Sequence, residues 1–308
     1  MNKQPLIVVA GPTASGKTRL AIDIAKSFDG EIVSADSMQI YKYMDIGTAK
    51  PTVEERAECR HHLIDFVEPD EEFSVADYVN LAHEVIADIA ARGKLPVMCG
   101  GTGLYINSVV DDVTFGEMDT DHALREELKA IAEKEGSERL IEMLSEFDPV
   151  SAARLHPNNL RRIIRAIEFY NSTGVPISEH QAMTKQIESR YDPIMFSIDY
   201  PRETLYERIN LRVELMVKEG LLNEVKKIMD MGYTRELNSM KGIGYKEIMA
   251  YYNGECTLEE AIDAVKQGSR RYAKRQLTWF RRDKRINMLE PANAVETAIN
   301  KIKRSLYP

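Results

Sequence analysis

The sequence predicts an α/β fold, a parallel β-sheet flanked by helices, into which an all-helical domain is inserted. Short runs rich in aliphatic and β-branched residues occur at Leu6–Ala10 and Leu95–Cys99, and they have the length of buried parallel strands. A long central stretch instead alternates charged residues with Leu and Ile at helical spacing and contains no such run. We therefore predict a core of residues 1–118 and 191–308 and a helical insertion of residues 119–190.

The composition is that of an ordinary globular protein. Of its 308 residues, 44% are hydrophobic and 29% are charged, which excludes wholesale disorder and fibrous repeats. No apolar run is long enough to span a bilayer, and the N-terminus does not resemble a signal peptide. The three cysteines are far apart and odd in number, which favours a reducing compartment over a disulfide framework. We expect a cytoplasmic protein without a membrane partner.

The charge is distributed unevenly along the chain. A formal net charge of −8 argues against a polyanionic partner, yet the segment Lys266–Arg285 is rich in Lys and Arg and contains a single acid. Tyr272, Trp279 and Phe280 lie among these cations, and such a mixture suits stacking on bases and holding phosphates. The segment is therefore either a nucleic-acid-binding face or a solvated helix face in which Trp279 fills the core.

The first predicted strand leads directly into a phosphate-binding loop. The loop matches the pattern G-x-x-x-x-G-K-[ST], and the residues Arg19–Lys26 that follow it are predicted to form a helix. In such a loop the backbone amides surround an anion, Lys17 adds a positive charge and Thr18 is placed to bind Mg²⁺. This context favours a P-loop NTPase-like sheet and a polyphosphate ligand over a purely structural glycine turn. The predicted diphosphate- or nucleotide-binding residues are Gly11, Pro12, Thr13, Ala14, Ser15, Gly16, Lys17 and Thr18.

Two common uses of such a loop find no support in the sequence. The chain has no Asn-Lys-x-Asp tetrapeptide that would read guanine, which weakens a GTPase interpretation. It also has no aliphatic strand ending in Asp or Glu, the element that assists Mg²⁺ in motor ATPases. The loop thus predicts that a polyphosphate binds, without identifying it as ATP and without implying hydrolysis.

The second predicted strand, Glu31–Ser34, places Asp36 beside the phosphate loop. Ligands of open α/β sheets bind at the carboxyl ends of the strands, where a carboxylate can assist a metal or act as a general base. The alternative role for Asp36 is an Asx turn that closes the strand. Gln39 offers donor and acceptor groups suited to a base edge. The polar loop Asp45–Pro51 is expected to form another wall of the same crevice.

The third strand is followed by Gly100, Gly101 and Gly103, which allow the backbone to approach a ligand closely. The neighbouring His61 and His62 superficially suggest a metal site. Adjacent side chains point apart, however, and no second Cys/His cluster has zinc spacing. We expect these histidines to stabilise a loop instead.

The insertion is predicted to consist of helices, with a further strand, Tyr191–Asp199, directly after it. Its basic residues would either meet nucleic acid or pair with local acids, and composition alone favours pairing. The helices are expected at His122–Glu135, Ser137–Ser145 and Asn159–Tyr170, and the basic residues are Arg154, His156, Arg161, Arg162 and Arg165.

A helix that begins near Pro201 carries Arg208 and Arg212 on one face, because they are four residues apart. Forked guanidinium donors suit a diphosphate, although the two arginines would equally serve as surface charges. The helix is expected to break at Gly220, and a glycine-bracketed loop at Met240–Lys246 precedes another helix.

These motifs follow one another along the chain as Gly11–Thr18, Asp36–Gln39, Asp45–Pro51, His61–Asp65, Gly100–Tyr105, Arg154–Asn158, Pro201–Glu203 with Arg208 and Arg212, Ile243–Glu247 and Tyr272–Arg281. In order and spacing the chain resembles the bacterial tRNA dimethylallyltransferases, also called tRNA isopentenyltransferases, nearly from end to end. Two positions depart from the family pattern, which has an acid near Asn159 and a Gln near Arg161.

The resemblance implies transfer of a dimethylallyl group from dimethylallyl diphosphate to the 6-amino group of adenosine 37 of tRNA, with Mg²⁺ as cofactor and diphosphate released. The phosphate loop would bind the allylic diphosphate, Asp36 would be the general base, and Thr13 with one of the two arginines would contact the bridging oxygen. The implied catalytic residues are Asp36, Thr13, Lys17, Arg208 and Arg212, and the implied metal ligand is Thr18.

The same resemblance implies a monomer that grips the anticodon arm with its insertion and its basic segment, and that flips the adenine into the crevice. The implied tRNA-binding residues are Asp36, Ser37, Met38, Gln39, Thr102, Arg161, Arg162, Lys241, Gly242, Ile243, Gly244 and Tyr245.

Two other functional classes remain open at this point. A P-loop small-molecule kinase would need an acceptor pocket and a mobile arginine lid. An RNA-binding module whose loop senses a nucleotide would bind RNA tightly whether or not Asp36 is present. Within the family, some relatives prenylate free adenine nucleotides, and the basic segment together with the insertion favours tRNA here.

Overall fold

The computed structural model describes residues 3–113, 115, 121–184 and 188–306. The chain divides into two compact units, one formed by Met1–Val110 with Arg190–Pro308 and the other by Asp111–Ser189. The insertion thus begins before the predicted boundary between residues 118 and 119, which itself lies outside the described residues. Contact of the insertion with tRNA stays a prediction.

The first unit is built on a parallel six-stranded sheet, as the sequence predicts. Its strand order is β3-β2-β4-β1-β5-β6, so β4 lies between β2 and β1 and their carboxyl ends meet at one edge. Four strands match predicted runs, whereas β3 and β6 were missed because they are short. The strands are β1 (Gln4–Ala10), β2 (Gly30–Ser34), β3 (His61–His62), β4 (Leu95–Gly100), β5 (Tyr191–Ile198) and β6 (Ile286–Leu289).

The histidine pair forms β3 and not the predicted loop. His61 pairs with Ile32 and His62 with Val33 in parallel register. The His62 ring lies 2.8 Å from a carboxylate oxygen of Glu31, and the Arg92 guanidinium binds the same carboxylate through two contacts of 2.6 and 2.7 Å. Arg92, with His62 adding to its effect, lowers the pKa of Glu31 to about 2. The histidines therefore complete the sheet edge through a partner that the local sequence does not reveal.

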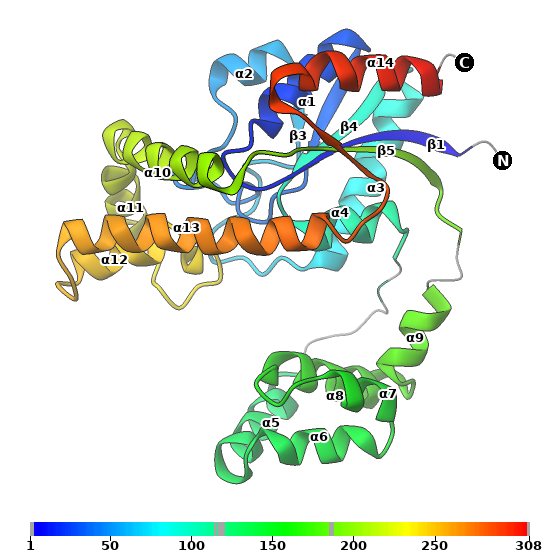
Figure 1. The fold of residues 1–308 in the computed structure, drawn as a ribbon. Helices are drawn as coiled ribbons and strands as arrows, with labels where there is room; N and C mark the ends of the chain where they lie inside the picture. The colour runs from blue at the N-terminus through cyan, green and yellow to red at the C-terminus, as the bar shows by residue number, and fades with distance from the viewer. Residues whose placement is uncertain (1–2, 114, 116–120, 185–187, 307–308) are drawn as a thin grey trace. The chain divides into compact units, whose positions relative to one another are not determined.

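Helices cover both faces of this sheet (Figure 1). On one face lie α1 (Lys17–Ser27) and α14 (Ala294–Leu306), and on the other lie α3 (Val75–Ala91) and α4 (Gly103–Val110). The apolar side of α1 is fully buried against the sheet together with the inner side of α14. This arrangement leaves the carboxyl edge of the sheet accessible for a ligand.

A group of four packed helices lies at that edge, visible on the left of Figure 1. It consists of α10 (Arg202–Glu219), α11 (Leu221–Asp230), α12 (Tyr245–Tyr252) and α13 (Leu258–Phe280). The predicted break between α10 and α11 occurs at Gly220, whose φ of 110° suits glycine. A separate apolar core joins α11 and α12 to residues that follow β2, among them Ile40 and Met44. The segment after β2 is thereby attached to the helices.

The second unit is helical throughout its regular elements, and its core is formed by leucines and isoleucines such as Leu140 and Ile163. Arg161 and Arg162 are exposed at the beginning of α8, and Arg125 forms two hydrogen bonds with the buried carboxylate of Glu168. The helices are α5 (His122–Glu135), α6 (Ser137–Ser145), α7 (Pro149–Arg154), α8 (Leu160–Thr173) and α9 (Ile177–Thr184).

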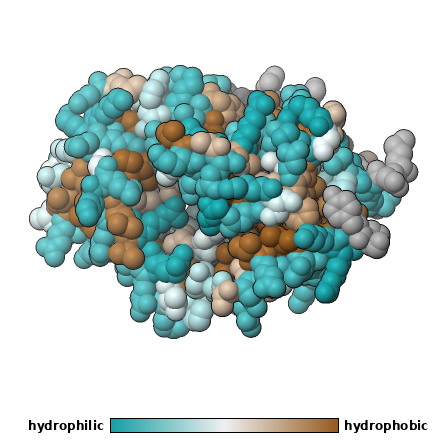
Figure 2. Space-filling view, turned by 90° about the horizontal axis from the view of Figure 1, so that it is seen from above, coloured by the Kyte–Doolittle hydropathy of each residue, from teal (hydrophilic) through white to brown (hydrophobic). Residues whose placement is uncertain are grey.

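Hydrophilic residues predominate on the face seen in Figure 2, where apolar ones form separate patches. None of the described helices combines the length and apolarity needed to cross a membrane. The remaining short elements are α2 (Val53–Glu58), η1 (Ser239–Lys241) and η2 (Pro291–Asn293).

Candidate active site

Three neighbouring strand ends converge at the carboxyl edge of the sheet. β1 leads into the phosphate loop, β2 leads to Asp36, and β4 leads to Thr102. The last two segments are joined directly, because the Thr102 hydroxyl accepts a hydrogen bond from the Ser37 amide at 2.9 Å and the Thr102 amide donates to Ala35 O at 3.0 Å. The convergence predicted from the sequence is therefore present.

A cavity of about 320 Å³ opens between these strand ends and helices α10, α12 and α13. The structure brings most predicted site residues to it, from segments that are far apart in the chain. Thr102 does not line the cavity but hydrogen-bonds to Ser37, which does. Arg161 and Arg162 belong to the other unit and do not line the cavity. The predicted residues that line it are Thr13, Lys17, Thr18, Asp36, Ser37, Met38, Gln39, Arg212, Lys241, Gly242, Ile243, Gly244 and Tyr245.

The ammonium group of Lys17 places a positive charge in the phosphate loop. The Lys17 ammonium donates a hydrogen bond to the Pro12 carbonyl at 3.3 Å. Burial lowers the pKa of Lys17, and the nearby charge of Arg212 lowers it further. Cys99 and the Asp36 carboxylate raise this pKa, but by less than burial lowers it. An anion placed in the loop would stabilise the charged form of this lysine. The electrostatics of the loop thus match the polyphosphate predicted from its pattern.

Gln276 on α13 holds the phosphate loop in place, and the sequence analysis missed it. Its side-chain oxygen accepts a hydrogen bond from the Thr13 amide at 3.1 Å, and its nitrogen donates to Gly101 O at 2.9 Å. The side chain is only 5% exposed. Its spacing from the buried Ala273 and Phe280 puts all three on one helix face, so helical periodicity within the basic segment could have identified it.

The glycines after β4 make room for other parts of the protein, and their predicted approach to a ligand stays a prediction. A Cβ on Gly100 would lie 2.1 Å from Ala35 O, and one on Gly103 would lie 2.4 Å from the Trp279 ring. Trp279 is 41% exposed and its indole nitrogen donates to Asn107 at 3.1 Å, so the interpretation of this residue as core filler is wrong. The glycines set how closely α13 packs against the end of β4.

Arg208 and Arg212 lie on the same face of α10 but have different surroundings. The Arg208 guanidinium donates to Ala14 O at 2.9 Å and lies 4.7 Å from the centre of the Tyr200 ring. Arg212 lines the cavity and makes no hydrogen bond or ion pair within the described part of the chain. Burial lowers the pKa of Arg212. All the donors of Arg212 therefore remain available to an anion, whereas Arg208 already uses its Nε donor within the protein.

Asp36 forms the predicted Asx turn and also faces the cavity, whereas its role as a general base stays a prediction. One carboxylate oxygen accepts a hydrogen bond from the Met38 amide at 3.0 Å, which forms the Asx turn, while the side chain lines the cavity. The Gln39 amide is occupied within the protein, since it accepts from Ser34 at 3.2 Å and donates to the Thr48 and Ala49 carbonyls. Recognition of a base by Gln39 stays a prediction.

The basic segment covers the second half of α13 and the residues directly after it, and it brings an aromatic side chain to the cavity. Tyr272 lines it, and the Arg275 guanidinium lies 5.4 Å from the centre of the Tyr272 ring. Burial, reinforced by the Asp36 charge, raises the pKa of Tyr272 to about 12. Arg271, Lys274 and Arg275 are exposed. The helix therefore presents cations to solvent next to an aromatic ring within the cavity.

The IPP transferase family model matches residues 39–283 of the chain. Among proteins similar in sequence, the tRNA dimethylallyltransferase of Caldanaerobacter subterraneus subsp. tengcongensis is 54% identical over 278 residues, which are 90% of this chain and 88% of that protein. The tRNA dimethylallyltransferase of Acetivibrio thermocellus is 52% identical over 277 residues, again 90% of this chain and 88% of that protein.

Solved structures show the same similarity. The full-length tRNA isopentenylpyrophosphate transferase of Bacillus halodurans superposes with a TM-score of 0.72 at 44% identity, covering 99% of this chain and 96% of that one. A eukaryotic dimethylallyltransferase described as acting on tRNA superposes with a TM-score of 0.82 at 29% identity, covering 98% of this chain and 78% of that one.

Proposed function

The chain belongs to the IPP transferase family, and from this membership we propose how its cavity carries out prenyl transfer to tRNA. The observation that carries the proposal is that one cavity is lined by both the phosphate loop and Asp36. The first provides a site for a diphosphate leaving group, and the second provides a base for an incoming amine. We take dimethylallyl diphosphate as the donor and the 6-amino group of adenosine 37 as the acceptor.

The donor diphosphate binds in the phosphate loop. Loop amides, Lys17 and the available guanidinium of Arg212 surround its oxygens, and Thr13 lies next to the bridging oxygen. Stabilising the leaving group promotes ionisation of the allylic C–O bond, since the resulting cation is delocalised. Arg208 supports this site by holding the loop carbonyl of Ala14.

Mg²⁺ fits the donor set of this site. The Thr18 hydroxyl lies in the first turn of α1 and lines the cavity together with the Asp36 carboxylate. No group of three or more His, Cys, Asp or Glu able to hold a metal occurs in the described parts of the chain. A Mg²⁺ held by the Thr18 hydroxyl together with substrate and water oxygens would need no such group. This ion would neutralise charge on the diphosphate.

The acceptor amine reacts next to Asp36. The C–O bond of the donor breaks, a C–N bond forms to the adenine 6-amino nitrogen, one proton passes from that nitrogen to Asp36, and diphosphate leaves. Because the adenine lone pair is drawn into the ring, removal of the proton by a positioned base assists the attack. The adenine must leave the stack of neighbouring bases to enter the cavity. Residues Lys241–Tyr245 and Tyr272 line the side of the cavity that would receive it.

The reaction is tested by incubating the protein with Mg²⁺, dimethylallyl diphosphate and unmodified tRNA, then weighing the digested nucleosides by mass spectrometry. We expect adenosine heavier by one dimethylallyl group at the position 3′ of the anticodon, and no adduct in the presence of EDTA. A parallel incubation with AMP should give no product, since we propose tRNA as the acceptor of this monomeric, cytoplasmic enzyme. ATP turnover with a small hydroxyl acceptor would instead support a kinase.

The charge-reversal pair Lys274→Glu with Arg275→Glu is expected to weaken tRNA binding and to reduce the slope of log K against log salt by about two. Both side chains are exposed on α13, the helix that lines the cavity. Filter binding at several salt concentrations measures the slope. The matched control is Lys303→Glu with Arg304→Glu, which makes the same charge change at exposed positions of α14. Equal slopes in both double variants would make the basic segment a solvated face.

A further inference from the structure

The loop of residues 45–50 forms a wall between two cavities. Gly47 and Ala49 line the cavity that contains Asp36, while Ile46, Ala49 and Lys50 line a neighbouring cavity of about 680 Å³. The two cavities share residues of the phosphate loop and of α10. The position of this loop therefore affects the space on both sides, although the loop contains no helix or strand of its own.

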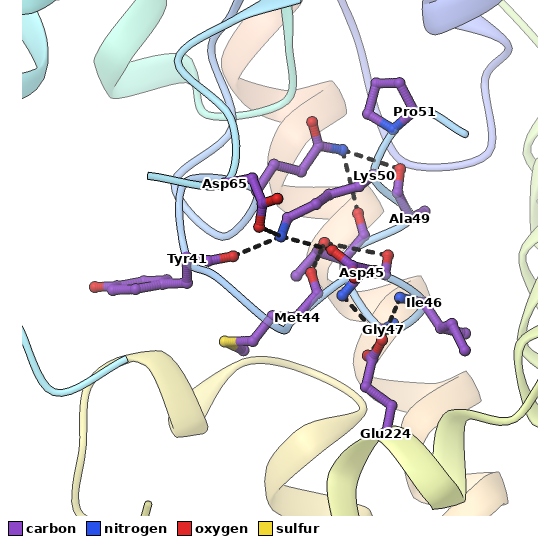
Figure 3. Close-up of polar contacts among 12 residues, drawn as sticks. Tyr41, Met44, Asp45, Ile46, Gly47, Ala49, Lys50, Pro51, Asp65 and Glu224 are labelled. Carbon is purple, nitrogen blue, oxygen red and sulfur yellow. Dashed lines mark hydrogen bonds and ion pairs between the residues drawn. The ribbon is translucent and has the colours of Figure 1, made fainter. Parts of the chain in front are cut away.

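The side chain of Glu224, on α11, holds the loop from one side (Figure 3). One carboxylate oxygen accepts hydrogen bonds from the amides of Asp45 at 2.9 Å and Ile46 at 2.7 Å. The other accepts from the Gly47 amide at 3.0 Å and from the Tyr245 hydroxyl at 2.6 Å. A single carboxylate thus satisfies three consecutive backbone donors and one side-chain donor. Only a carboxylate offers enough acceptor positions for all four.

Lys50 holds the same loop from the other side, as Figure 3 also shows. Its ammonium donates to the Tyr41 carbonyl at 2.6 Å and forms ion pairs of 2.7 Å with Asp45 and Asp65. The lysine side chain is only 1% exposed, whereas both carboxylates are partly exposed. Both ends of the loop are therefore attached to surrounding segments by charged groups with several hydrogen bonds each.

The loop also packs directly against a residue of the acceptor side. A Cβ on Gly47 would lie 2.6 Å from atoms of the Tyr245 ring, so only glycine permits this contact. Tyr245 is 0% exposed, and its hydroxyl is the one bound to Glu224. Burial, followed by the Glu224 charge, raises the pKa of Tyr245, which keeps the hydroxyl a donor. Glu224, Gly47 and Tyr245 consequently form one contact between the loop and α12.

We propose that Glu224 is a positioning residue of the prenyl transfer, which fixes the loop of residues 45–50 against Tyr245 and so sets the width of the acceptor side of the cavity. Glu224 itself does not line that cavity. It lies on α11 between Leu221 and Val225, both fully buried, so its carboxylate is held by a rigid helix. This inference rests on the function proposed above, because that function places the adenine of the tRNA on the side of the cavity that Tyr245 lines.

The main test is Glu224→Gln. The amide retains one acceptor oxygen, but its NH₂ group faces two donors at the other position, so two of the four hydrogen bonds are lost. We expect kcat with tRNA to fall by about 10–10²-fold, since small displacements of a bound reactant reduce rate strongly. Affinity for inorganic pyrophosphate, measured by calorimetry, should be unchanged, because Gln276 and Arg208 hold the phosphate loop independently.

The matched control is Asp230→Asn, which removes a carboxylate from the same helix; among the described residues, Asp230 pairs only with exposed Lys226. This variant should keep wild-type kcat. An unchanged kcat in Glu224→Gln, or a parallel loss of pyrophosphate affinity in folded protein, would overturn the positioning role. Absence of any adduct with the wild-type enzyme would instead refute the proposed function, so the two failures are distinguishable.

A double-mutant cycle with Tyr245→Phe isolates the contact itself. The Phe variant keeps the ring against Gly47 and removes only the hydroxyl, which is buried and turned to Glu224. If the two residues act through their shared contact, the double variant should lose less activity than the product of the single losses. If the loss of activity in the double variant equals the product of the two single losses, the proposal is contradicted. Should Glu224→Gln not fold, wild-type kcat in Tyr245→Phe alone would overturn it.

Discussion

Asp36→Ala is expected to lower the turnover number for prenyl transfer by about 10²–10⁴-fold, the range typical of a lost general base. Affinity for tRNA should be nearly unchanged, because the remainder of the cavity wall and the exposed cations of α13 are retained. The physical reason is that the adenine amine keeps its proton as the C–N bond forms unless a positioned carboxylate accepts it. Single-turnover kinetics and tRNA binding, measured on the same preparation, test both parts.

The matched variant Asp36→Asn separates the base from the turn. Its side-chain oxygen can still accept the hydrogen bond from the Met38 amide, which Asp36 accepts at 3.0 Å, so the loop after β2 should keep its shape. We expect the turnover number of Asp36→Asn to be as low as that of Asp36→Ala. Wild-type turnover in both variants would remove Asp36 from the mechanism. Recovery of activity in Asn alone would show that the turn, and not proton removal, is the contribution of this residue.

Arg212→Gln is expected to lower turnover by about 10²–10³-fold, as found when one donor to a developing negative charge is removed. The Arg212 guanidinium lines the cavity beside the phosphate loop and makes no hydrogen bond or ion pair within the described residues, so its donors are available to the leaving group. Pyrophosphate affinity should also decrease, because Arg212 binds diphosphate both before and after the C–O bond breaks. Calorimetry and single-turnover rates measure the two effects.

The neighbouring Arg208→Gln provides the comparison. Its guanidinium donates to the Ala14 carbonyl and lies over the Tyr200 ring, so its removal should disturb the loop and reduce turnover less than loss of Arg212. The sequence could not rank the two arginines, since both lie on one face of the helix. A larger loss in Arg208→Gln than in Arg212→Gln would reverse this assignment and make Arg208 the partner of the bridging oxygen.

Local patterns identified most of what lies at the ends of the strands. The apolar runs before Gly11 and Asp36 predicted β1 and β2, and their polar ends line the cavity as expected. Such runs are recognisable because buried parallel strands are apolar on both faces. The two-residue β3 has no such signal, and its histidines became part of the sheet through pairing with Ile32 and Val33.

For the glycines after β4, the sequence predicts close packing but does not identify the neighbouring groups. Gly100 and Gly103 were expected to admit a ligand, because a missing side chain predicts close approach without saying of what. The structure shows that the approaching groups are the Ala35 backbone and the Trp279 ring. The same packing leaves Trp279 partly exposed, although an isolated tryptophan is usually buried.

The sequence by itself determined the fold class, the phosphate loop and the family, because each is written in contiguous residues or in the order of short motifs. Only the tertiary structure decided which groups support the site. Gln276 binds Thr13 across 263 residues and Glu224 binds Gly47 across 177. Helical periodicity can indicate that Gln276 is buried, but it does not identify the partner of either side chain. Likewise, the contrast between Arg208 and Arg212 depends on the neighbours that folding brings to each guanidinium. Charge and residue type are local properties, whereas the partner of a side chain is a property of the packed structure.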